Sequence, residues 1–298
     1  MKRREFLKYT IIVGAFLPFS KFDILSKDAK KIIFTSDHES QDKFYEIIKT
    51  AKKEQWHKLE INEIIINAAK EFIDIPYQGA TLEGEGDESC RINFNGLDCV
   101  TFFENSLGIA RVIKKKKSDF TDLVDEIVFT RYRNGILGDY TSRLHYTSEW
   151  IMNNKIKKTI EDVTSKIGGI KLPINVSFMS ANPDKYQQLS NNKLFVKTIK
   201  KIEQNINKHK FFYIKTEDIP KYQHLIKTGD ILALATGIKG LDYSHTGLAY
   251  RDENDELRLF HASSAQKKVI IDKGLYDYMS AKKKDIGITV LRPLNPVK

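Results

Sequence analysis

Apolar residues recur at helical spacing through the first third of the chain. Between residues 42 and 73, two apolar groups follow the 3.6-residue period of an amphipathic helix and predict two successive helices. The first group is Phe44, Ile47 and Ile48, and the second is Ile61, Ile64, Ile65, Ala68 and Phe72. Residues 75–98 are rich in turn residues and show little periodicity. A third helix then follows, with Cys99 in its first turn. Its predicted apolar face is Val100, Phe103, Leu107, Ala110 and Ile113.

The second half of the chain changes from a helical to an alternating pattern. Residues 118–225 are predicted to be mainly helices and loops, with helices in DFTDLVDEIVFTRYR, GDYTSRLHYTSEWIMNN and NKLFVKTIKKIEQNIN. From about Phe211, runs rich in β-branched and aromatic residues predict strands. These runs are FFYIK, GDILALAT, YSHTGLAY, LRLFHAS, KVIID and IGITVLR. Helices followed by strands indicate an α+β fold with a mostly antiparallel sheet.

The first twenty residues differ from the rest of the chain. MKRREFLK is basic, and YTIIVGAFLPF is an apolar run too short to span a bilayer as a helix. Arg3 and Arg4 with the following residues resemble a twin-arginine signal, although Lys2 stands where that motif has Ser or Thr. We therefore expect an export signal in residues 1–20 and a periplasmic protein that meets the membrane only during export. An uncleaved N-terminal anchor is the alternative.

Composition bounds the remaining 278 residues, 21–298. The chain has 298 residues, 41% of them hydrophobic, which is enough for one core. We expect a single catalytic domain over residues 21–298, with a helical elaboration in about 118–225. No internal repeat or low-complexity linker is present.

The net charge of +10 raises the question of a nucleic-acid partner. Residues 1–20 hold four basic side chains and one acidic one, so the remainder carries +7. Its lysines are scattered, and the one dense run, Lys114–Lys117, lies at the end of a predicted helix, where cations are favourable. We expect a solvated face there and no nucleic-acid partner. A weakly acidic envelope polymer would suit the same surface.

Two cysteines, Cys90 and Cys99, are too few for a disulfide framework and lack a zinc-ligand spacing. They could pair with each other, or Cys99 could be a nucleophile. A helix N-terminus lowers the pKa of a thiol, and Cys99 has that position. A base could come from His245 or His261, sixteen residues apart in two predicted strands joined by a hairpin at RDEND. His245 could then face Cys99 while His261 orients it.

These segments resemble a known group of enzymes. LDCVTFFE, SHTGLAY and FHASS are similar to the catalytic segments of NlpC-type cell-wall cysteine peptidases and amidases, papain-like enzymes that cut amide bonds in peptidoglycan. TGDILALAT is similar to the strand that precedes their histidine. Other segments resemble one branch, long catalogued as a domain of unknown function and related to N-acetylmuramoyl-L-alanine amidases. They are PYQGATLE, RYRNGILGDYTSRLHYTSEWI, SFMSANPDKYQQL, GLDYSHTGLAY and HASSAQKKVIID.

The resemblance implies a papain-like NlpC-type fold and a role for each matched residue. Cys99 would be the nucleophile, His245 the general base and then acid, and His261 the residue that holds the imidazole. Tyr77 would hydrogen-bond the substrate or the oxyanion, and the backbone N–H of Cys99 would be a second oxyanion donor. Asp98 takes the place of an acid that binds a free amino terminus in related peptidases, or it caps the helix.

Further residues are candidates for substrate binding. Ser142, Arg143 and His145, in SRLHY, are expected at a polar helix start that lines the cleft, where Arg143 suits a peptide carboxylate. A structural ion pair is the alternative for Arg143. We also expect Ser244, which precedes His245, to bind the substrate or the oxyanion.

The hypothesis from sequence is a Cys-His-His amidase that hydrolyses the N-acetylmuramoyl-L-alanine bond of muropeptides, without metal or cofactor. Three alternatives remain: an endopeptidase that cuts the stem peptide after D-glutamate, an exported wall-binding protein with a Cys90–Cys99 disulfide, and a metal-dependent hydrolase that uses His145, His245 and His261. The sequence leaves the oligomeric state open.

Overall fold

The computed structural model describes residues 7–11 and 32–297. Residues 1–6 and 12–20 of the predicted export signal lie outside the described residues. The five residues between them, β1 (Leu7–Ile11), pair antiparallel with β2 (Ile32–Ser36), which pairs in parallel with β3 (Cys90–Arg91). No helix in the described part of the chain is long and apolar enough to cross a membrane.

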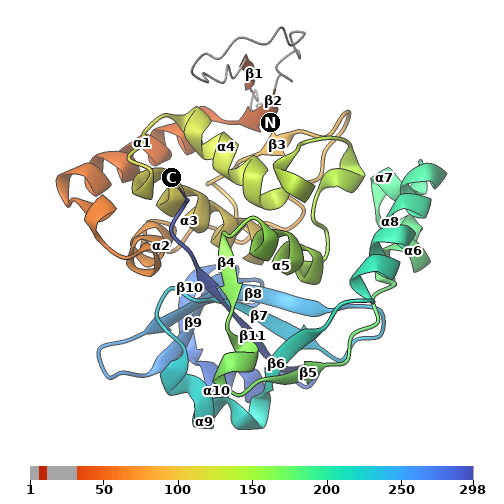
Figure 1. The fold of residues 1–298 in the computed structure, drawn as a ribbon. Helices are drawn as coiled ribbons and strands as arrows, with labels where there is room; N and C mark the ends of the chain where they lie inside the picture. The colour runs from red at the N-terminus through yellow and green to blue at the C-terminus, as the bar shows by residue number, and fades with distance from the viewer. Residues whose placement is uncertain (1–6, 12–31, 298) are drawn as a thin grey trace, which may run out of the picture.

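The centre of the molecule is an eight-stranded sheet, antiparallel at every strand pair (Figure 1). Its order is β10-β9-β8-β7-β11-β6-β5, with β4 paired to β11. All six strands predicted from sequence form. They are β6 (Phe211–Lys215), β7 (Ile231–Thr236), β8 (Tyr243–Arg251), β9 (Leu257–Ser263), β10 (Lys268–Gly274) and β11 (Asp285–Pro293).

The region expected to be helical also contributes to this sheet. β4 (Ile160–Asp162) and β5 (Ile170–Leu172) are three residues each, too short to show an alternating pattern in the sequence. Both form because a long strand already offers an edge: β4 pairs with the end of β11, and β5 pairs with β6. The prediction of mainly helices and loops over 118–225 therefore did not include these two short strands.

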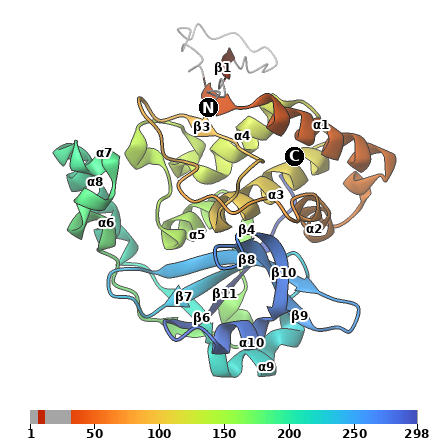
Figure 2. The same ribbon diagram turned by 180° about the vertical axis from the view of Figure 1, so that it is seen from behind.

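Helices cover both faces of the sheet (Figures 1 and 2). One face carries α1 (His38–Lys53), α2 (Ile61–Lys70), α3 (Cys99–Lys114), α4 (Phe120–Arg131) and α5 (Thr147–Ile156). The other carries α9 (Ile219–Tyr222) and α10 (Leu275–Ser280). To one side stand α6 (Phe178–Ala181), α7 (Gln187–Ser190) and α8 (Lys193–Ile206).

The alternation along the central strands divides the core between these faces. In β8, Leu248 belongs to the apolar cluster under α3, whereas its neighbour Ala249 belongs to the cluster under α10. In β9, Phe260 and Leu259 divide in the same way. Successive side chains of a strand point to opposite faces, so a few residues hold both helical layers onto one sheet.

Helix α3 is the centre of the helical layer. The sequence predicted one apolar face, but every residue from Thr101 to Ile113 is buried. The helix packs on α2 and α4 as well as on β8 and β9, so even its polar side chains find partners inside. Glu104, for example, accepts hydrogen bonds from Arg131 (2.6 Å) and Trp150 (3.0 Å). A helix surrounded on all sides holds its first residue, Cys99, in a fixed place.

In the lysine run at the end of α3, Lys115, Lys116 and Lys117 are exposed, as expected of a solvated face, and Lys114 is half-buried. Lys114 donates to the Leu59 carbonyl, Lys115 pairs with Glu126, and Lys117 pairs with Asp122 at 2.8 Å. These contacts join the helix end to its neighbours.

Candidate active site

Cys99 is the first residue of α3, and Asp98 caps the helix. Oδ1 of Asp98 accepts from the backbone N–H groups of Val100 (3.0 Å) and Thr101 (2.8 Å), and the Thr101 hydroxyl completes the capping box. Such a cap binds backbone N–H groups of the first turn, which have no acceptor within the helix. The backbone N–H of Cys99 hydrogen-bonds the thiol of its own residue, which is one of the contacts that act to lower the pKa of that thiol. This N–H therefore points to the side of the helix start on which the thiol lies.

Strand β8 crosses directly beside the cysteine. The Thr246 hydroxyl donates to the Cys99 carbonyl at 2.9 Å, and Thr246 also hydrogen-bonds the thiol through its side chain and backbone. Thr246 follows His245, so the thiol lies against the residue next to the expected base. Residues 147 positions apart in sequence thus meet at one place.

The electrostatics of the thiol differ from the sequence-based expectation. We expected the helix N-terminus to lower its pKa, but burial, with the charge of Asp98 as the second cause, raises the pKa of Cys99 to about 11. Burial is the main reason for the reversal, because an apolar environment disfavours the charged thiolate. The Asp98 carboxylate adds to it, because a negative charge at the N-terminus offsets the positive end of the helix dipole. The free protein accordingly holds Cys99 as a thiol.

The two histidines form a pair. Nε2 of His245 lies 2.5 Å from Nδ1 of His261, and the ring planes are nearly perpendicular at 88°. Burial, followed by the charges of His261 and Lys282, lowers the pKa of His245 to about 3. Burial also lowers the pKa of His261. Both imidazoles are therefore neutral at physiological pH, and His245 can accept a proton.

A third side chain, which was not predicted from the sequence, extends this pair. Oδ2 of Asp272, in β10, lies 3.2 Å from Nε2 of His261. Asp272 ends the predicted strand KVIID, and a terminal acid on a strand beside the histidine strand was the available signal.

Two further residues complete the surroundings of the histidines. The Tyr278 ring of α10 meets the His261 ring edge-on at 5.3 Å, and Nζ of Lys282 lies 4.9 Å above the Tyr278 ring. Gly247 makes room for His261, because a Cβ there would lie 3.0 Å from that of His261 and 2.9 Å from the Phe260 carbonyl.

Tyr77 lies beside the nucleophile candidate through a small backbone pairing. It forms a parallel bridge with Leu97, and its N–H donates to the Lys267 carbonyl at 2.8 Å. Burial is the main cause that raises the pKa of Tyr77, and the nearby Cys99 and Asp98 raise it further. The Tyr77 hydroxyl therefore keeps its proton near the thiol.

The SRLHY residues do not begin a helix. Helix α5 begins only at Thr147, and Arg143 is extended, at φ −69° and ψ 141°. The helical pattern predicted there failed because Asp139 forms its own cap with Thr141, which starts a short 3₁₀ turn instead. Ser142 donates to the Asp139 carbonyl within that turn.

Arg143 and His145 are occupied by contacts within the protein. The buried Arg143 donates to Glu83 (2.7 Å) and to the Leu82 carbonyl (2.9 Å), and Glu88 lies 3.5 Å from its Nε. His145 bonds the Tyr140 carbonyl at 2.8 Å, and burial lowers its pKa well below the ordinary value. The geometry favours the structural alternative for Arg143, since its fork already holds the turn-rich segment.

Ser244 is exposed at the start of β8. Its hydroxyl donates to Oδ1 of Asp285 at 2.6 Å, which joins β8 to β11.

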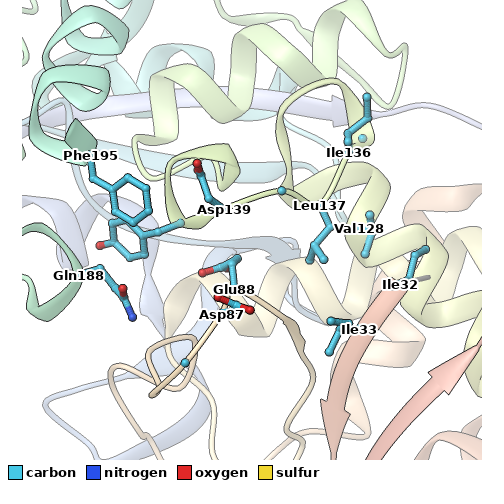
Figure 3. Close-up of a pocket in the computed structure, with 14 residues that line it drawn as sticks. Ile32, Ile33, Asp87, Glu88, Val128, Ile136, Leu137, Asp139, Gln188 and Phe195 are labelled. Carbon is cyan, nitrogen blue, oxygen red and sulfur yellow. The ribbon is translucent and has the colours of Figure 1, made fainter. Parts of the chain in front are cut away.

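Two cavities border the turn-rich segment, of about 530 and 610 Å³. Figure 3 shows the first, with Asp87 and Glu88 from this segment, Asp139 from the loop after α4, and Phe195 from α8 around it. The described lining of neither cavity includes Cys99 or the histidine pair.

The remaining chemical possibilities concern the cysteines and a metal. Both cysteines are free thiols, and Cys90 is fully buried, so the expected alternative of a Cys90–Cys99 disulfide is wrong for this structure. Among the described residues, no group of three or more His, Cys, Asp or Glu side chains is placed to hold a metal ion.

Comparison with known proteins places this arrangement in a family. A family model described as AmiA-like, N-acetylmuramoyl-L-alanine amidase-like, matches residues 67–288, which include the cysteine and both histidines. The chain belongs to the N-acetylmuramoyl-L-alanine amidase-like family. The matched region begins within α2 and ends within β11, so it contains the helix and the strands that bring these residues together.

Solved structures agree with membership of the amidase-like family. An N-acetylmuramoyl-L-alanine amidase from Bacteroides uniformis is 34% identical, with a TM-score of 0.75 over 79% of this chain and 99% of that one. A Bacteroides fragilis protein described as a presumed xylanase is 36% identical, with a TM-score of 0.72 over 76% of this chain and 98% of that one. A Legionella pneumophila protein, 21% identical, shares the fold with a TM-score of 0.67 over 87% and 96% of the two chains. None of the curated proteins compared matches the chain.

Proposed function

We propose that this chain is a cysteine-dependent N-acetylmuramoyl-L-alanine amidase of the NlpC-type, papain-like kind, acting on muropeptides after export to the periplasm. The observation that carries the proposal is the junction of α3 and β8, where the Cys99 thiol lies against Thr246 and the neighbouring His245 bonds His261. A thiol at a helix start, with a neutral imidazole on the strand that adjoins it, suits nucleophilic attack on a carbonyl.

The first step would form a thioester. His245 takes the proton of Cys99 as the sulfur attacks the lactyl carbonyl of the muramyl group. The C–N bond to L-alanine breaks, and the same proton passes from His245 to the departing amine. Because the pKa of Cys99 is raised and that of His245 is lowered, proton transfer accompanies attack rather than preceding it.

The second step would release the sugar. Water gives a proton to His245 as its oxygen attacks the thioester carbonyl, and that proton returns to the sulfur as the S–C bond breaks. The products are the free lactyl carboxyl group and the Cys99 thiol. In both steps the oxyanion would accept hydrogen bonds from the backbone N–H of Cys99 and the hydroxyl of Tyr77.

The chemistry favours an amide over a glycosidic bond as the target. Most glycosidases need a pair of carboxyl groups on either side of the bond they cut. At Cys99 the adjacent carboxylate, Asp98, is committed to the helix cap. A thiol with a neutral imidazole suits acyl transfer instead, so we attribute the similarity to the presumed xylanase to a shared fold.

Product masses test the assignment. A disaccharide-tetrapeptide, in anhydro and reduced forms, would be incubated with the wild type, with Cys99→Ala and with Cys90→Ala as the matched cysteine control. The proposal expects intact tetrapeptide from the wild type and Cys90→Ala, and none from Cys99→Ala. Release of the L-alanine–D-glutamate part still attached to the sugar would assign an endopeptidase, and cleavage between the sugars would assign a glycosidase.

A further inference from the structure

Asp272 lies where it can act on the histidine pair. Ile270 of β10 pairs with His261 of β9, and Asp272 stands two residues further along. Side chains two residues apart share a face of a strand, so the carboxylate is a diagonal neighbour of His261. The pairing shifts between Ile271 and Gly274, and such a bulge re-aims the side chains within it.

The carboxylate is held at both oxygens. Oδ1 accepts the N–H of Lys273 at 2.7 Å, while Oδ2 lies 3.2 Å from Nε2 of His261. The backbone bond fixes the plane of the carboxylate before any substrate arrives. His261 is 1% exposed, which keeps solvent water from its ring. Among the described residues, Oδ2 of Asp272 is the acceptor that lies at its Nε2.

The hydrogen-bond chain determines where the ring protons lie. An ionised carboxylate only accepts, so His261 must carry its proton on Nε2. A neutral His261 then has a lone pair on Nδ1, which can accept only if Nε2 of His245 donates across the 2.5 Å contact. Nδ1 of His245 is left without a proton, and a nitrogen with a free lone pair is what a general base requires.

We propose that Asp272 is a positioning residue that sets the tautomers of both histidines and so leaves Nδ1 of His245 free to accept the proton of Cys99. This inference rests on the proposed function, since it takes His245 as the base. Asp272 touches neither substrate nor thiol in this account, and it acts through His261.

The decisive experiment observes the ring nitrogens directly. Imidazole ¹⁵N chemical shifts distinguish protonated from unprotonated nitrogens, and His245→Gln and His261→Gln variants would assign the signals. In the wild type at neutral pH, we expect both histidines to carry the proton on Nε2. In Asp272→Asn, the amide can donate to Nε2 of His261, so we expect the proton of His245 to move to Nδ1. A wild-type His245 protonated on Nδ1, or tautomers unchanged in Asp272→Asn, would overturn the inference.

Kinetics give the second readout. Asp272→Asn should lower kcat by roughly 10²- to 10⁴-fold with little change in KM, because a wrong tautomer removes the base without removing substrate contacts. Asp272→Glu keeps the carboxylate and should recover most of kcat. The matched control is Asp277→Asn, an exposed acid of α10, which should change neither quantity. Equal kcat for Asp272→Asn and the wild type would count against the role.

The two readouts separate failure of the inference from failure of the proposed function. Ring shifts need no substrate, so a chain inactive on muropeptides can still show the expected tautomers. Conversely, the protein could be an active amidase whose histidine tautomers are the same in the wild type and in Asp272→Asn. That result would refute this inference and leave the proposed function intact.

Discussion

The Cys99 thiol sets the reactivity of the site. With a pKa of about 11, only about 10⁻⁴ of it is thiolate at neutral pH, so its direct reaction with an alkylating reagent should be slow. We predict that labelling by iodoacetamide accelerates about tenfold per pH unit from neutral pH to about pH 10. The rate is read by mass spectrometry of the Cys99 peptide.

The second cysteine serves as the control in the same experiment. Cys90 is fully buried, and burial raises the pKa of its thiol to about 12, so the folded protein should leave it unlabelled. A labelling rate for Cys99 that is already constant below neutral pH would mean a preformed thiolate and would contradict the proton transfer described above.

Gly247 tests how tightly His261 is held. A methyl group there would meet the Leu259 side chain at 2.8 Å and the Phe260 carbonyl at 2.9 Å. We predict that Gly247→Ala lowers the free energy of unfolding by about 1–3 kcal/mol through overpacking and reduces turnover by displacing His261. Gly237→Ala is the control, because its nearest neighbour lies at 3.6 Å. Chemical denaturation and a parallel activity assay measure both effects. Equal stability and equal turnover of Gly247→Ala and Gly237→Ala would contradict the prediction.

At the scale of elements, the cap of α3 links stability to reactivity. Asp98→Asn keeps a good capping oxygen but removes the charge that helps to raise the pKa of Cys99. We predict a free energy of unfolding within about 0.5 kcal/mol of the wild type and faster alkylation of Cys99 at neutral pH. Both are measured on the same samples, by denaturant titration and by labelling rate.

Two variants bracket that prediction. Asp98→Ala should lose about 1 kcal/mol with the cap and also speed alkylation. Asp119→Asn, at the similar cap of α4, should leave the labelling of Cys99 unchanged. Unaltered alkylation in Asp98→Asn would show that its charge does not act on the thiol.

The sequence predicted long elements better than short ones. Strands such as β8 and helices such as α2 repeat their period often enough to be recognised, whereas β4 and β5 exist because β11 and β6 offer edges far away in sequence. The predicted helix start at Ser142 failed for a local reason, the cap formed by Asp139.

The candidate site could be predicted where the residue type and its order along the chain indicate a chemical role. Cys99, His245 and His261 are found by helix and strand position, and the structure brings the two histidines together. The contact of Asp272 depends on the register of β10 against β9, which short apolar strands do not reveal. The partners of Arg143 lie 55–61 residues earlier in a loop without periodicity, so its ion pairs were equally hidden.

At the scale of the whole molecule, the shared sheet predicts one cooperative unit. Both tryptophans, Trp56 and Trp150, lie in the apolar cluster under the helices of one face, while Leu259 lies in the cluster under α10. We predict that Leu259→Ala lowers the free energy of unfolding by about 2–5 kcal/mol and shifts the tryptophan-fluorescence and far-UV circular-dichroism midpoints equally. A fluorescence midpoint that stays at the wild-type value would show that the two layers unfold separately.

The central claim is that the Cys99 sulfur attacks the lactyl carbonyl of a muropeptide. Rapid acid quenching of wild-type protein with an anhydro-disaccharide-tetrapeptide, followed by peptide mapping by mass spectrometry, tests it most directly. We predict a thioester on the Cys99 peptide whose added mass is that of the sugar acyl group without any amino acid, and no adduct or turnover with Cys99→Ala. An adduct that retains L-alanine and D-glutamate, an adduct on another residue, or full turnover by Cys99→Ala would contradict it.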